Sequence, residues 1–417
     1  MTRATRVARP LLARASPLEP LRYRDFRLLW FGQGGSGIGY WMDQVARGWL
    51  MYELTDSALQ LGLVTAIRAI PLFLLSPVAG VWADRYRRKR LLVASQTVNV
   101  AFFGALAILI FGGSVQPWHV YLAALGTAIA QVFEGPARQA MLPETVPATH
   151  LTNAIGLNSI VFNSSRTVGP AVAGMLISAV GSGGSYSAQA LIYALCVFWT
   201  LQIGEAGASA QRHPGRRASV LSSTLEGWRF IAGNETVRAS MMITATTALL
   251  AVPFITLLPI FAKDVLDVGA TGQGLFLAAM GVGALLSAVL LATVGDRLFR
   301  GPLMLGGAVL YGVSLLGFAG SPWFVISLVL LTAAGLANVA CNALVQSVVQ
   351  AATPSALRGR VMAVFLQREL LTTLGGLLAG ALAALLSAPA AVALMAGACL
   401  ALSVGIALVI PAIREIH

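Results

Sequence analysis

Long apolar segments recur along the whole chain, and they constrain its fold more than any other feature. Each is at or near the length of about 20 residues that a helix needs to cross roughly 30 Å of hydrocarbon. The sequence therefore predicts an all-α membrane protein with twelve transmembrane helices. The segments lie at about 26–52, 61–83, 91–112, 118–140, 153–179, 186–204, 239–262, 271–294, 302–319, 323–350, 359–386 and 390–411.

Composition excludes a soluble protein. The chain is 57% hydrophobic and 11% charged, whereas a soluble domain carries about 25% charged residues. The net charge of +12 falls in short clusters between the apolar segments, so it reflects membrane topology and we expect no nucleic-acid partner. Cys196, Cys341 and Cys399 lie inside apolar segments without metal-ligand spacing. We expect no metal site and no cofactor.

With twelve segments that cross the membrane alternately, most of the arginines lie on the same side of it. They occupy the N-terminal tail, the loop at 84–90, the central linker and the loops near Arg300 and Arg360. The opposite loops hold no lysine or arginine except Lys263. The positive-inside rule then places both termini in the cytoplasm.

This pattern divides the chain into five parts. We predict two six-helix halves joined by a polar linker, in which residues 221–231 could form an amphipathic surface helix. The expected parts are a basic tail at 1–21, a half at 22–204, the linker at 205–238, a second half at 239–411 and a tail at 412–417.

A glycine, an acid and a cluster of arginines follow the second segment, and a shorter copy follows the eighth. Pro147 and Pro354 occupy matching places after the fourth and tenth segments. Parallel halves related by an axis along the membrane normal imply a central pathway. The repeated acid–arginine pair predicts a conformational latch; the alternative is a loop that only satisfies topology. The latch residues are Gly80, Asp84, Arg85, Arg88, Asp296 and Arg297.

The loop from Gly80 to Lys89 resembles the signature loop of the major facilitator superfamily, although Arg87 stands where many members have glycine. Further blocks resemble the branch that contains the enterobactin exporter and macrolide efflux proteins. They are 26–33, 49–55, 71–77, 135–139 and 166–170. The stretch from Gly169 to Gly174 is similar to the fifth-helix motif of drug/proton antiporters, but Ala173 replaces its first paired glycine.

Polar side chains at helical spacing form candidate substrate contacts. The superfamily resemblance implies a cavity lined by the first, fourth, seventh and tenth helices. The alternative is that such neutral amides have no substrate contact and only hold neighbouring helices together through hydrogen bonds. The cavity candidates are Gln33, Tyr40 and Gln44 on the first segment, Thr127 and Gln131 on the fourth, and Asn338, Asn342 and Gln346 on the tenth.

Ionisable residues inside apolar segments are functional candidates. Asp43 lies one turn from Arg47, and Arg68 on the second segment lies at similar depth, so Asp43 could pair with either arginine. Asp43 is a candidate proton carrier; the alternative is a permanently paired structural carboxylate.

The fourth and fifth segments carry a second charged group. Glu134 and Arg138 share a face of the fourth segment, and Glu134 is the second coupling candidate. For Arg138 we expect a structural pair rather than a substrate contact, and Arg166 on the fifth segment could balance Asp43 or Glu134. Arg368 and Glu369 on the eleventh segment have no account from sequence.

The resemblance implies a secondary exporter of a siderophore or a hydrophobic drug, driven by proton antiport. We expect a monomer in the bacterial inner (plasma) membrane, with a small-molecule substrate, protons and the lipid bilayer as partners. Two alternatives are a lipid or lysophospholipid flippase on the same fold and a membrane-embedded acyltransferase. The chain carries no Walker loop, His-Glu-x-x-His motif or clustered histidines, so we expect no enzyme.

Overall fold

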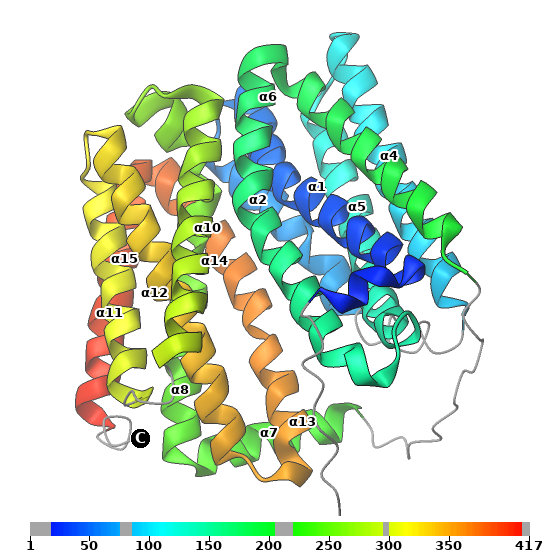
Figure 1. Ribbon diagram of the computed structural model, residues 1–417. Helices are drawn as coiled ribbons and strands as arrows, with labels where there is room; N and C mark the ends of the chain where they lie inside the picture. The colour runs from blue at the N-terminus through cyan, green and yellow to red at the C-terminus, as the bar shows by residue number, and fades with distance from the viewer. Residues whose placement is uncertain (1–17, 76–85, 205–219, 295–299, 411–417) are drawn as a thin grey trace, which may run out of the picture.

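The computed structural model describes residues 18–75, 86–204, 220–294 and 300–410, and helices dominate these ranges (Figure 1). The predicted latch residues Gly80, Asp84, Arg85, Asp296 and Arg297 lie outside them. The first half holds η1 (Glu19–Arg22), α1 (Arg24–Thr55), α2 (Ala58–Ile67), α4 (Arg88–Phe111), α5 (Pro117–Met141), η2 (Leu142–Glu144), η3 (Ala148–His150) and α6 (Leu151–Gln202).

The second half follows the helix α7 (Val220–Gly233), which covers the residues 221–231 where a surface helix was expected. The seventh span then begins at Glu235, four residues before its predicted start. Its helices are α8 (Glu235–Thr246), η4 (Thr247–Ala251), η5 (Val252–Leu257), α9 (Leu258–Ile260), η6 (Phe261–Val265), α10 (Gly269–Val294), α11 (Arg300–Ala319), α12 (Phe324–Ala352), α13 (Ser355–Leu366), α14 (Arg368–Leu385) and α15 (Ala388–Val409).

Nine helical stretches within the described ranges are long and apolar enough to cross a membrane. The helices α1 and α5 have spanning length as well, and α6 passes twice, which accounts for the twelve predicted spans. The sequence predicted a loop at 181–185 between the two passes of α6. The structure turns at Gly181 alone, with φ 79°, a conformation that glycine adopts without a Cβ clash.

Two spans depart from regular α-helix near the middle of the molecule. The seventh span combines π, 3-10 and short α-helical turns from Thr247 to Val265, where Pro253 and Pro259 each remove a backbone donor. The eleventh span breaks at Gln367 between α13 and α14. Such irregular turns free backbone groups and often occur at functional sites.

The two halves lie side by side in Figure 1, the half that begins in blue beside the half that ends in red. They touch through α2 against α14 and through the first pass of α6 against α10. Glycines make this close approach possible. A Cβ on Gly174 would lie 2.6 Å from the Ala270 carbonyl, and one on Gly274 would lie 2.4 Å from the Pro170 carbonyl. The backbones therefore meet directly.

These glycine contacts lie toward the end of the helix bundle at which α1 ends, which is here called the Thr55 end. The opposite end of the bundle is called the Arg24 end. Polar contacts also join the halves at the Thr55 end. Lys263 Nζ lies 2.5 Å from Asp56 Oδ1 and 5.0 Å from the centre of the Tyr52 ring. The Thr55 end is thus held closed by both backbone and side-chain contacts.

At the Arg24 end, α7 lies against α13. Glu226 forms an ion pair with Arg360, and Gly227 lies against the Arg360 carbonyl. Ile231 is buried in the same apolar cluster as Val361 and Phe365. The linker helix is therefore fixed to the second half.

Candidate functional site

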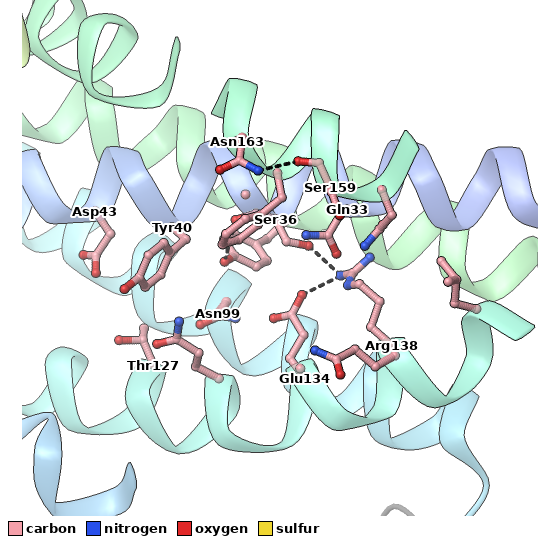
Figure 2. Close-up of a pocket in the computed structure, with 18 of the residues that line it drawn as sticks. Gln33, Ser36, Tyr40, Asp43, Asn99, Thr127, Glu134, Arg138, Ser159 and Asn163 are labelled. Atoms are coloured by element: carbon pink, nitrogen blue, oxygen red, sulfur yellow. Dashed lines mark hydrogen bonds and ion pairs between the residues drawn. The ribbon is translucent and has the colours of Figure 1, made fainter. Parts of the chain in front are cut away.

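A cavity of about 640 Å³ lies within the first half (Figure 2). Its wall comes from α1, α4, α5 and α6, with Arg68 from the end of α2. It runs from Asp43 to Leu142, Pro143 and Leu151 at the Arg24 end. This first cavity therefore leads from the membrane interior to the Arg24 end, with polar and apolar side chains in its wall.

Asp43 forms the inner limit of the first cavity and is 4% exposed. It pairs with Arg47, one turn along α1, and with Arg68, whose Nη1 lies 2.8 Å from Asp43 Oδ2. The sequence predicted that either arginine could be the partner, and the structure brings in both. Burial makes the ion pairs necessary, because an isolated carboxylate in the membrane is costly.

Predicted cavity residues complete the network around Asp43. Arg68 Nη2 donates to Gln131 Oε1 at 3.0 Å, and Arg47 Nη2 donates to Gln44 Oε1 at 2.7 Å. Gln44 Nε2 then donates to the Tyr40 hydroxyl at 3.1 Å. Arg68 stands at the C-terminal cap of α2, so its tie to Asp43 links two spans, whereas Arg47 shares a helix with Asp43.

A second ion pair lies nearer the Arg24 end. Arg138 Nη2 donates to Glu134 Oε1 at 2.6 Å and to Ser36 Oγ at 2.7 Å (Figure 2). Its Nη1 donates to the Leu29 carbonyl at 3.4 Å. Both partners of the ion pair are buried. Sequence reasoning missed Ser36, although it shares the α1 face of Gln33 and Tyr40 by helical spacing.

A second cavity, of about 310 Å³, lies between the halves. Tyr40, Gln44 and Arg47 line it from α1, and Arg166 lines it from α6. The second half contributes the irregular seventh span together with Asn338, Asn342, Arg368 and Glu369. Residues from both halves thus face one central space.

Arg368 and Glu369, which the sequence left unexplained, belong to this second cavity. Arg368 Nη1 donates to Asn342 Oδ1 at 2.5 Å, and its Nε lies 3.5 Å from Glu369 Oε1. The helix break at Gln367 precedes them directly. Arg368 therefore connects the eleventh span to Asn342 of the tenth span.

Arg166 pairs with neither Asp43 nor Glu134, because those carboxylates are held by other arginines. Its guanidinium carbon lies 5.4 Å from the centre of the Trp41 ring. Among the described residues, no carboxylate forms an ion pair with it. The expectation that Arg166 balances one of the two carboxylates is not met in this structure.

The remaining predicted residues divide between the cavities and the surface. Gln33 and Thr127 line the first cavity, where the Thr127 hydroxyl donates to the Ala123 carbonyl of its own helix. Gln346 lines neither cavity and is exposed, because it lies one helical turn beyond Asn342. Arg88 of the predicted latch forms an ion pair with Glu144.

A family model described as transmembrane secretion effector matches residues 15–417. The chain belongs to the major facilitator superfamily. The match confirms the resemblance noted in the signature loop and the twelve-helix fold that it implied. The chain is accordingly a multi-pass membrane transporter.

The curated relatives are exporters or transporters. The staphyloferrin A transporter of Staphylococcus aureus is 25% identical over 82% of this chain and 85% of its own. The multidrug efflux pump Tap of Mycobacterium tuberculosis is 28% identical over 81% of this chain and 82% of its own. Macrolide efflux protein A of Streptococcus pyogenes is 24% identical over 70% and 73%.

A solved structure gives the same fold. The nucleoside transporter NupG superposes with a TM-score of 0.73 over 95% of this chain and 99% of its own, at 15% identity. That likeness concerns the fold alone, and the curated relatives carry the functional comparison.

Proposed function

We propose that the chain is a secondary active exporter that moves a small organic molecule out of the cytoplasm by alternating access. One observation carries the proposal. The first cavity runs from the buried Asp43 network to the Arg24 end, while the Thr55 end is closed by contacts between the halves. The arginine asymmetry assigns the Arg24 end to the cytoplasm, so the substrate enters from inside.

The substrate class follows from the relatives, whose names include a siderophore transporter and multidrug and macrolide efflux proteins. A siderophore or a hydrophobic drug is therefore the proposed cargo. The protein acts as a monomer in a bacterial inner membrane with both termini in the cytoplasm.

Proton antiport supplies the driving force, and Asp43 carries the proton. Arg47 stays one turn from Asp43 in any state, because both lie on α1. Arg68 belongs to another span and can move away when the halves rock. Loss of that partner from a desolvated carboxylate favours proton binding. Glu134 is the alternative carrier, although Arg138 holds it from the same helix.

A flank of the first half favours a second candidate, a lipid or lysophospholipid flippase. An apolar groove of about 300 Å³ lies between α1 and the two passes of α6. Its wall includes Trp30, Ile192 and Trp199, and it carries almost no polar surface. Such a groove would suit an acyl chain as well as a hydrophobic drug.

The test uses purified protein in inside-out oriented proteoliposomes with an imposed pH gradient. Labelled siderophores, macrolides and lysophospholipids are offered on the outside. Gradient-dependent accumulation of a siderophore or macrolide supports the exporter. Movement of only the lysophospholipid would transfer the assignment to the flippase, and transport unaffected by collapsing the pH gradient would exclude proton coupling.

A further inference from the structure

We propose that Arg166 and Arg368 form an anion-binding site in the second cavity, so that the exported molecule carries a carboxylate or similar acidic group. This inference rests on the proposed export function and narrows its substrate class. It depends on three features of the inter-half cavity: an arginine that no carboxylate among the described residues compensates, a second arginine that lines the same cavity from the other half, and an excess of positive charge.

Within the part of the chain that the structure describes, no carboxylate compensates the charge of Arg166. It lies in the first pass of α6, within the membrane interior, and its side chain is largely buried. Within the described ranges, its guanidinium lies over the face of Trp41 and interacts electrostatically with Tyr40 and Tyr311, and no carboxylate pairs with it. A cation–π contact compensates a buried guanidinium only in part. Burying an unpaired arginine in a membrane span costs free energy. A ligand that supplies the missing anion would offset this cost and so explain why the arginine is there.

Arg368 enters the same cavity from the opposite half. It follows the break between α13 and α14, and the Asn342 side chain orients it. Glu369 compensates it only partly, because the two lie 3.5 Å apart and the Glu369 side chain is 55% exposed. Arg368 therefore keeps donors for a further acceptor.

The second cavity carries an excess of positive charge, which also favours an anionic ligand. Arg47, Arg166 and Arg368 line it, against the single carboxylate of Glu369. Asp43 compensates Arg47 from the adjoining network. Neutral polar groups, among them the amides of Asn338 and Gln44, also line the cavity.

An acidic substrate would join the halves. A guanidinium holds a carboxylate through two parallel hydrogen bonds, and here one guanidinium comes from each half. Because the distance between the halves changes during transport, such a ligand would bind the two states unequally. That inequality is what a substrate needs to shift the conformational equilibrium.

The experiment measures binding to purified protein in detergent without any gradient. The probes are carboxyfluorescein and rhodamine 123, which share a xanthene ring system and differ in charge, followed by fluorescence anisotropy. We expect carboxyfluorescein to bind at least about tenfold more tightly than rhodamine 123. Arg166→Gln and Arg368→Gln should each lower its affinity about tenfold or more, the effect of losing a charge-assisted hydrogen bond.

Two further variants make the result interpretable. Arg166→Lys keeps the charge and should retain part of the affinity, which separates charge from folding. Arg24→Gln removes an arginine whose side chain is 61% exposed at the start of α1, and it should bind carboxyfluorescein as the unmodified protein does.

Equal binding of the two dyes, absence of carboxyfluorescein binding, or unchanged affinity in a folded Arg166→Gln protein would overturn the inference. The binding assay requires no transport, so a failure of pH-driven export in proteoliposomes would not affect its result. Likewise, a failure of dye binding would leave the export function itself untouched.

Discussion

The hydroxyl of Tyr52, in the last turn of α1, donates a hydrogen bond to the carboxylate of Asp264 in the seventh span. The bond joins the two halves at the Thr55 end. Directly beside it, Lys263 pairs with Asp56 across the same boundary. Any state that opens the Thr55 end must break both contacts, so they form a polar clasp on the closed end.

The first prediction tests this clasp. The double variant Tyr52→Phe/Asp56→Asn removes the hydrogen bond to Asp264 and the ion pair, and it should shift the equilibrium toward opening at the Thr55 end by about tenfold. The measurement is the labelling rate of Thr65→Cys, in the second cavity, by a membrane-impermeant maleimide added from the outside. Glu53→Gln alters a contact within one half, to Ser182, and should leave the rate unchanged. An unaltered rate in the double variant would remove the clasp from the account.

The second prediction concerns the glycines between the halves. Gly174→Ala places a methyl group 2.6 Å from the Ala270 carbonyl, so the closed Thr55 end must separate and transport should fall several-fold. Gly156→Ala lies on the same helix with no neighbour within 4 Å of the new carbon and should transport normally. Initial rates in proteoliposomes give the comparison. Equal rates in both variants would show that the close approach has no part in the cycle.

The third prediction fixes the orientation. Ser114 is exposed beyond the Thr55 end of α4, and Ala232 is exposed on α7 at the Arg24 end. Ser114→Cys should react with an impermeant maleimide on intact cells, and Ala232→Cys only after the membrane is opened. Native cysteines are buried and should stay silent. Labelling of both sites in intact cells would refute the arginine-based topology.

The fourth prediction comes from the sequence alone, because Asp84 lies outside the described residues. Asp84→Asn should cripple turnover while the protein still inserts and folds, since the duplicated acid–arginine pattern indicates a conformational latch. Transport rate per folded protein, with folding judged by size-exclusion chromatography, is the readout. Full-rate transport by the well-folded variant would leave the loop with a topological role only.

Much of the fold could be predicted because membrane length and polarity repeat at fixed spacing. The spans that contain Leu29, Phe103 and Leu331 are apolar runs of the length that a bilayer requires. The structure departs from the predicted spans where glycine or proline residues determine the local backbone conformation. Gly181 closes a turn without the predicted loop, and Pro253 with Pro259 disturbs the seventh span.

The candidate site was predictable within a helix but less so between helices. Helical spacing identified the neighbours Asp43 with Arg47 and Glu134 with Arg138. Depth along the membrane placed Arg68 near Asp43. Spacing could not show that Arg166 and Arg368 line one cavity, because the packing of the fifth span against the second half sets that relation.

Proton coupling through Asp43 is the central claim, and Asp43→Asn tests it most directly. The amide imitates the protonated carboxyl permanently, so it cannot load and release a proton. In proteoliposomes, this variant should lose concentrative transport driven by a pH gradient, while it keeps substrate binding and exchange that needs no gradient. If Asp43→Asn still concentrates the substrate against its gradient, Asp43 only holds Arg47 and Arg68 in place, and the account is contradicted.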